Sequence, residues 1–326
     1  MKVIVISTQK GGNGKSTTAV NLAAALALAG ARVGCVDCEP QAHFGKCLGV
    51  EVQTVAPARS VGKMILDETL GVAWTRQQIL DALYDVENAI LPGKYDISGS
   101  IHLFGSELNT LVSAERQISS IGNSAIASLR RILLRVEEDF DYIVIDTPPT
   151  TQSLCQVGLA AADHVIAPCM PKWLSIGGVT VIRSLASTIN EITKGECNPQ
   201  YLGVVNNDTS PPSKMAAEEI LIRNALVNGF DPDGKAAGLP RQRPRVKKSR
   251  VDLYPFVTEI RHDVRISDAA NDGVPAVVSA VNYAPGKAYL ALMEEVLTRM
   301  DTPEQQWPIA DAFDIGTVDD EAEVNV

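Results

Sequence analysis

The segment Lys10–Thr17 (KGGNGKST) constrains the fold of this chain more than any other feature. It follows a short apolar run, Lys2–Ser7, and precedes an Ala- and Leu-rich run with helical periodicity, Ser16–Ala29. A glycine-rich turn between a strand and a helix lets backbone N–H groups point at a phosphate, because glycine has no Cβ in the way. The N-terminus of the helix adds a partial positive charge. We therefore predict a phosphate-binding loop at Lys10–Thr17.

Apolar runs and helical patterns alternate along the rest of the chain. The runs expected to form strands are Lys2–Ser7, Arg32–Asp37, Ile101–Phe104, Tyr142–Asp146, His164–Ala167 and Tyr201–Asn206, with a later strand near Pro255–Ile260. The expected helices include Ser16–Ala29, Ser124–Glu137, Lys214–Val227 and a last helix, Lys287–Arg299. This alternation is typical of an α/β fold with a mostly parallel twisted sheet and helices on both faces. We predict that residues 1–300 form one such domain.

Charge is distributed unevenly along the 326 residues. The net charge is −10, and eight acidic residues but no Lys or Arg lie from Asp301 onward. We expect residues 301–326 to be an acidic, disordered tail. A Gly- and Pro-rich insertion near residues 228–250 carries a basic cluster, consisting of Arg241, Arg243, Arg245, Lys247, Lys248 and Arg250. Such a cluster favours binding to nucleic acid phosphates.

The composition narrows the class of protein. The chain is 45% hydrophobic and 21% charged, and its apolar runs are shorter than the roughly 20 residues that span a bilayer. The apolar N-terminus is better explained as a first buried strand than as a signal peptide, so we expect a cytoplasmic protein. Cys35 and Cys38 have C-x-x-C spacing, but no second pair completes a metal site. We expect both to be packing residues.

Two aspartates follow apolar strands, where ligands bind in open α/β sheets. Asp37 ends one predicted strand and Asp146 ends another. With the phosphate-binding loop, Asp146 and the Ser16 hydroxyl are expected to hold Mg²⁺, and Lys15 to reach the β- and γ-phosphates. Thr147–Pro149 is then a candidate switch segment that senses the terminal phosphate.

These residues resemble the ParA/MinD superfamily of deviant Walker A P-loop ATPases, and most closely the ParA/Soj-type partition proteins. The resemblance covers about residues 1–300 and rests on Lys10–Thr17, Val36–Gln41 (usually D-x-D-P-Q), Asp146–Pro149 and Thr258–Val277. It implies an ATPase that uses ATP and Mg²⁺ and forms a nucleotide sandwich dimer. It also implies that the dimer binds nonspecific nucleoid DNA and that a ParB-like adaptor stimulates hydrolysis.

The resemblance also assigns roles to individual residues. Lys10 matches the lysine that reaches the partner's phosphates across a dimer interface, and Glu39 stands where an acidic residue orients the attacking water. Asp37 joins Ser16 and Asp146 as a metal residue. Either Asn206 or Asn207 reads the adenine, and Arg265 touches DNA together with the basic cluster. The nucleotide-binding loop comprises Gly11, Gly12, Asn13, Gly14, Lys15, Ser16 and Thr17.

Other functions are possible for such a chain. One is a positioning ATPase for a cargo other than DNA, and another is a small-molecule ATP-dependent ligase, for which the sequence shows no convincing substrate pocket. A redox ATPase would need paired cluster cysteines, but Cys155 and Cys169 lack the surrounding pattern. Membrane association would need a terminal helix with a basic face, and the acidic tail argues against it.

Overall fold

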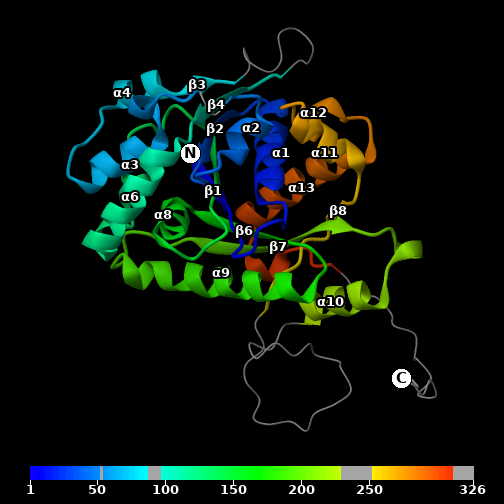
Figure 1. Ribbon diagram of the computed structural model, residues 1–326. Coiled ribbons are helices and arrows are strands. Elements are labelled where there is room, and N and C mark those ends of the chain that lie inside the picture. Colours follow the sequence, from blue (N-terminus) through cyan, green and yellow to red (C-terminus); the bar gives the residue numbers. More distant parts are fainter. Residues whose placement is uncertain (52–53, 87–96, 229–251, 311–326) are drawn as a thin grey trace, which may run out of the picture.

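A computed structural model describes residues 1–51, 54–86, 97–228 and 252–310. In these residues the strands form one eight-stranded sheet in the order β3-β4-β2-β5-β1-β6-β7-β8 (Figure 1). Their bounds are β1 Lys2–Ile6, β2 Arg32–Asp37, β3 Tyr84–Asp85, β4 Ser100–Phe104, β5 Tyr142–Asp146, β6 His164–Cys169, β7 Gln200–Thr209 and β8 Ile260–Arg261. The strand pairs are parallel except β3 with β4, which confirms the predicted fold class.

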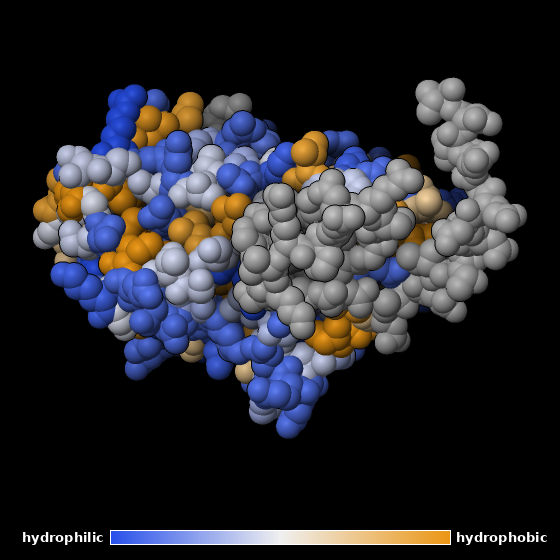
Figure 2. All heavy atoms as spheres, turned by 90° about the horizontal axis from the view of Figure 1, so that it is seen from below, coloured by the Kyte–Doolittle hydropathy of each residue, from blue (hydrophilic) through white to orange (hydrophobic). Residues whose placement is uncertain are grey.

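Helices cover both faces of this sheet. Their bounds are α1 Lys15–Leu28, α2 His43–Cys47, α3 Val61–Thr69, α4 Arg76–Ala82, α6 Leu108–Ile121, α7 Ser128–Leu134, α8 Ser153–Ala161, α9 Trp173–Ile192, α10 Ala217–Asn228, α11 Val264–Asn271, α12 Ala276–Ser279 and α13 Ala284–Asp301. The face that carries α9 and α10 exposes a mixture of hydrophilic and hydrophobic residues (Figure 2). Such a mixed surface is ordinary for the solvent side of an outer helix layer.

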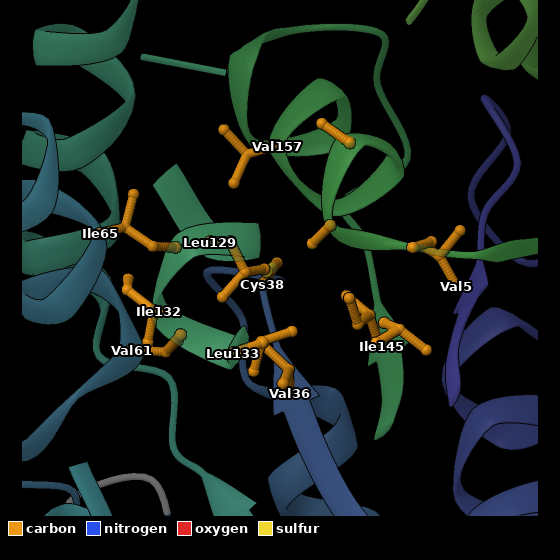
Figure 3. Close-up of a cluster of buried hydrophobic side chains, with 14 of the residues drawn as sticks. Val5, Val36, Cys38, Val61, Ile65, Leu129, Ile132, Leu133, Ile145 and Val157 are labelled. Carbon is orange, nitrogen blue, oxygen red and sulfur yellow. The ribbon is translucent and has the colours of Figure 1, made fainter. Parts of the chain in front are cut away.

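Alternate residues of the strands point to opposite faces of the sheet and supply the hydrophobic cores on the two faces. Val5 of β1 and Ile145 of β5 pack with Leu129 of α7 and Val157 of α8 on one face (Figure 3). Ile4 and its neighbours on the other face pack against α1, α12 and α13. Because β1 and β5 are buried on both sides, their sequences are apolar throughout.

The two cysteines of the C-x-x-C spacing lie in different cores. Cys35 belongs to the core beside α1, whereas Cys38 belongs to the core beside α7 (Figure 3). Both thiols are free and buried, and burial raises the pKa of each. They are packing residues, as the sequence predicted.

Some expected elements are shorter in the structure. The strand expected near Pro255–Ile260 is reduced to β8, with an isolated bridge between Val204 and Pro255. The helix expected at Ser124–Glu137 consists of a 3₁₀ turn, Asn123–Ala125, followed by α7. The 20-residue helix α9 was not predicted, because its sequence (WLSIGGVTVIRSLASTINEI) contains a Gly pair and several β-branched residues. Packing of its apolar face overrides these weak helix propensities.

The boundary predicted at residue 300 is too early. A 3₁₀ turn, Glu304–Gln306, follows α13, and Trp307 is buried against the core. The Trp307 indole donates to the carbonyl of Arg299, and the buried Arg299 guanidinium donates to the carbonyl of Pro308. The domain therefore extends at least to Pro308. The rest of the expected acidic tail, residues 311–326, lies outside the described residues.

Candidate functional site

The predicted phosphate-binding loop lies between β1 and α1 at the carboxyl edge of the sheet (Figure 1). Gly12 and Gly14 both have φ of 80°, a left-handed conformation that is strained for any residue with a Cβ. A Cβ on Gly14 would also lie 2.6 Å from Nδ2 of Asn207. Lys15 then starts α1, so the first N–H groups of the helix face the loop. The left-handed glycines and the N–H groups at the start of α1 form a geometry that is suited to binding an anion.

Two cavities flank this loop, and both are lined by Gly12, Gly14 and Thr17. The first cavity, which we call the base cavity, has a volume of about 320 Å³. Its other lining residues include Asn13, Asn207, Asp208, Ile260, Arg261 and His262. The second, which we call the phosphate cavity, has a volume of about 520 Å³. Its other lining residues are Gly11, Lys15, Ser16, Glu39, Gln41, His43, Cys47 and Pro149.

Asn207 belongs to the base cavity and Asn206 does not. The Asn207 amide donates to the carbonyl of Asn13 and to Oγ1 of Thr18, each at 3.0 Å. Its Oδ1 is buried without a described partner, so it can accept a hydrogen bond from a ligand. Asn206 points to the opposite side of β7, where Nδ2 donates to Glu259 at 3.5 Å. The geometry therefore favours Asn207 over Asn206 as the residue that contacts a base.

Ser16 lines the phosphate cavity, and its hydroxyl contacts the fully buried Asp146. The Ser16 hydroxyl donates to Oδ2 of Asp146 at 2.5 Å, while the buried Oδ1 of Asp146 has no described partner. Burial raises the pKa of Asp146 to about 7, although Ser16 and Lys15 oppose the shift. A carboxylate oxygen and a hydroxyl are hard ligands of the kind that Mg²⁺ prefers, so these two residues fit the metal.

Lys15 lies in the same cavity and is mostly buried. Its ammonium donates to the carbonyl of Lys10 at 3.4 Å. Burial lowers the pKa of Lys15, and the carboxylates of Asp146 and Glu39 counteract this effect. The buried ammonium of Lys15 can therefore pair with the negative charge of a phosphate bound at the loop.

Asp37 has a different environment from Asp146, although the two are register partners on β2 and β5. Its Oδ1 accepts from the N–H of Glu39 at 3.1 Å and its Oδ2 accepts from the N–H of Gly45 at 2.9 Å. Burial, with the charge of Asp146 added, raises the pKa of Asp37 well above its usual range. Because both oxygens hold the loop that follows β2, the described geometry does not favour Asp37 as a direct metal ligand. It instead orders the segment from Glu39 to α2.

Glu39 is placed by that segment at the wall of the phosphate cavity. It is largely buried, and its carbonyl accepts from the Ser106 hydroxyl at 2.8 Å. Its carboxylate lies near enough to Lys15 to influence the pKa of that lysine. An acidic group here can orient a water molecule in the cavity.

Helix α9 supports the loop from the side, which the sequence did not reveal. The buried Ser175 hydroxyl donates to Oδ1 of Asn13 at 2.9 Å, and Nδ2 of Asn13 donates to Oγ1 of Thr8 at 3.4 Å. A Cβ on Gly178 would lie 3.3 Å from Cγ of Lys10. Ser175 carries no sequence signal because it lies 162 residues from Asn13. Its role depends on the position of α9 alone.

The predicted switch segment begins next to β1. Oγ1 of Thr147 donates to the carbonyl of Ile6 at 3.2 Å, and Pro149 lines the phosphate cavity. This arrangement places the end of the segment at the wall of the phosphate cavity.

Arg265, the predicted DNA contact on α11, is half exposed. Its guanidinium forms an ion pair with Asp263 at 3.1 Å and lies 4.5 Å from the centre of the Tyr283 ring. The basic cluster predicted at residues 241–250 lies outside the described residues. Of the predicted DNA-binding residues, Arg265 is therefore the one that the structure describes.

Comparisons with known proteins identify the family. Residues 1–201 match the AAA domain family. Chromosome partitioning protein ParA of Myxococcus xanthus is 27% identical over 303 residues, which cover 93% of this chain and 90% of the relative. The sporulation initiation inhibitor protein Soj of Bacillus subtilis is 28% identical over 297 residues, which cover 90% of this chain and 98% of Soj. The chain belongs to the AAA domain family, and its similarity to the ParA and Soj proteins extends over most of its length. The resemblance of Lys10–Thr17 to the ParA/MinD superfamily is thus confirmed.

Solved structures of similar fold support the same fold class. An McdA variant from Cyanothece in complex with ATP has a TM-score of 0.67 at 23% identity, covering 91% of this chain and 96% of its own. Cobyrinic acid a,c-diamide synthase of Mycobacterium smegmatis, with an ATP analog and magnesium, has a TM-score of 0.66 at 20% identity, covering 96% and 99%. ATP is bound in the first of these neighbours, and an ATP analog and magnesium in the second, in line with the cofactors that the sequence predicts for this chain. Among the residues that the structure describes, none of the helices has an apolar stretch that could span a bilayer.

Proposed function

We propose that this protein is a DNA partition ATPase whose ATP-bound dimer binds nonspecific DNA and leaves it when an adaptor protein stimulates hydrolysis. The observation that carries the proposal is the phosphate site, in which a buried, unpartnered Asp146 oxygen lies beside Ser16 and the loop. The similarity to chromosome partitioning ParA over 93% of the chain supports the biological role.

The residues in and next to the phosphate cavity have different roles in ATP hydrolysis. Backbone N–H groups of the loop and the Lys15 ammonium bind the phosphates, and Asp146 and Ser16 hold Mg²⁺. The metal, when bound, neutralises part of the charge on the phosphates. Glu39 orients the attacking water, and Asp37 fixes Glu39 by accepting its backbone N–H. Since positioning dominates phosphoryl transfer, we expect slow turnover when no partner is present.

Dimer formation depends on Lys10 in this proposal. Lys10 lies at the start of the loop, and its carbonyl, rather than its ammonium, contacts Lys15. The ammonium of Lys10 would bind the phosphates held by a second copy of the chain. ATP would then be shared across the interface, and loss of the terminal phosphate would weaken the dimer.

Retention of the protein on DNA of arbitrary sequence tests the DNA-binding part of the proposal. We expect retention with ATP and Mg²⁺ but little with ADP, and weaker retention as salt rises, because phosphate contacts release counterions. Changing the six residues of the basic cluster to Ala should reduce the slope of log affinity against log salt by up to about 5. Arg265→Ala should reduce it by about 1.

Arg76→Ala is a matched control for Arg265→Ala. Both arginines are about half exposed and paired with an aspartate, but Arg76 lies on α4, away from α11. The control should retain DNA like the wild type. Equal retention with ATP, with ADP and without nucleotide would contradict the proposed switch.

A further inference from the structure

His43 lies in the phosphate cavity, and no role has been assigned to it so far. It is the first residue of α2 and lines the cavity together with Lys15, Ser16 and Glu39. Two features of the backbone place it there. Ala42 has a φ of 53°, which turns the chain after the Glu39 segment, and the N–H of Gly45 is held by Oδ2 of Asp37 at 2.9 Å.

The His43 side chain is available to a ligand. It is exposed, and among the described residues none forms a hydrogen bond or ion pair with its ring. The ionisable side chains that line the same cavity are Lys15, Glu39 and Cys47. An imidazole N–H is a hydrogen-bond donor that a phosphate oxygen can accept, and it is stronger as a donor when the ring is charged.

The two cavities define the direction in which a nucleotide would lie across the loop. Asn207, with its unpartnered Oδ1, is on the side of the base cavity. A chain of phosphates that starts there passes Gly12 and Gly14, which line both cavities, and ends in the phosphate cavity. The last phosphate of a triphosphate would therefore lie on the side of Glu39 and His43. The first two phosphates, which a diphosphate also has, would lie at the loop.

We propose that His43 contacts the terminal phosphate of bound ATP and makes the site favour ATP over ADP. The proposal rests on the proposed function, in which ATP occupies the loop. It adds a residue that distinguishes the two nucleotides without any part in binding the base or the metal. A change in nucleotide preference, rather than a general loss of binding, is the signature of this role.

Binding of ATP and of ADP, each with Mg²⁺, should be measured by calorimetry for the full chain and for His43→Ala. We expect ATP affinity to fall about tenfold, which corresponds to about 1.4 kcal/mol, and ADP affinity to stay within about twofold. His43→Lys places a positively charged donor at the same position and should restore most of the preference for ATP. Lys46→Ala is the control, because Lys46 is an exposed cation on the same helix but does not line the phosphate cavity.

The outcomes separate this proposal from the proposed function. An unchanged ratio of ATP to ADP affinity in His43→Ala would overturn the role of His43, as would an equal loss of both nucleotides. Retained ADP binding shows that the variant is folded. A wild-type protein that binds neither nucleotide would instead contradict the proposed function itself.

Discussion

Replacement of Asp146 by Asn should make the protein more stable in the absence of nucleotide and metal. Burial raises the pKa of Asp146 from 3.8 to about 7. The folded state therefore binds more protons than the unfolded state between about pH 4 and pH 7, and stability falls as pH rises through this window. The shift of about 3 units corresponds to about 4 kcal/mol of destabilisation at pH 8.

The substitution does not recover the whole of this free energy. The Asn side chain can still accept from Ser16, but its Nδ2 would replace the unpartnered Oδ1 and would lack an acceptor. An unpartnered buried donor costs about 1–3 kcal/mol. The net gain in the free energy of unfolding should be about 2 kcal/mol at pH 8. It should vanish or reverse near pH 4, where Asp146 is protonated and neutral.

Urea unfolding of both proteins from pH 5 to pH 8, without nucleotide or metal, measures this difference. Asp81→Asn, at an exposed carboxylate on α4, is the control and should behave as the wild type at every pH. With Mg²⁺ and ATP, the wild type should gain stability and the Asp146→Asn variant should gain less. The reasoning is refuted if the variant is no more stable than the wild type at pH 8, or if its advantage does not shrink on acidification.

Two further substitutions test the base cavity and the C-terminal packing. Asn207→Ala should weaken ATP and ADP binding by about tenfold, because it removes the buried Oδ1 and the amide that holds Asn13, whereas Asn206→Ala should leave both affinities within about twofold. Equal effects of the two changes in calorimetry would contradict the assignment. Arg299→Met should lower the free energy of unfolding by about 3–5 kcal/mol in a urea titration, because it leaves the buried carboxylate of Glu295 without its cationic partner. A loss below about 1 kcal/mol would show that the Arg299 network contributes little.

Much of the fold could be predicted because its signals are local. The apolar strands β1, β2 and β5 were expected with bounds within one residue of those observed, since parallel strands buried on both faces are continuously apolar. The helix α9 could not be predicted, because its helical state depends on packing over β6 and β7 rather than on its own propensities. The packing of Trp307 was missed for a similar reason. The segment around Trp307 is acidic and contains prolines. Nothing in its sequence indicates that it forms hydrogen bonds with Arg299.

The sequence by itself determined the phosphate-binding loop, since Gly12 and Gly14 allow a left-handed backbone and Lys15 and Ser16 follow at fixed positions on α1. Only the tertiary structure shows that Asn207 lines the base cavity and that Asn206 does not. Adjacent residues on a strand point to opposite faces of the sheet, and the placement of α1 and β8 determines which face holds the base cavity.

The tertiary structure likewise gave Asp37 and Asp146 different surroundings, although both end apolar strands in the sequence. Their strands are in register, but the loop after β2 folds back and donates to both oxygens of Asp37, while Oδ1 of Asp146 has no partner among the described residues. The chemistry of each side chain is fixed by its residue type, whereas its availability depends on which backbone N–H groups the fold brings within hydrogen-bonding distance.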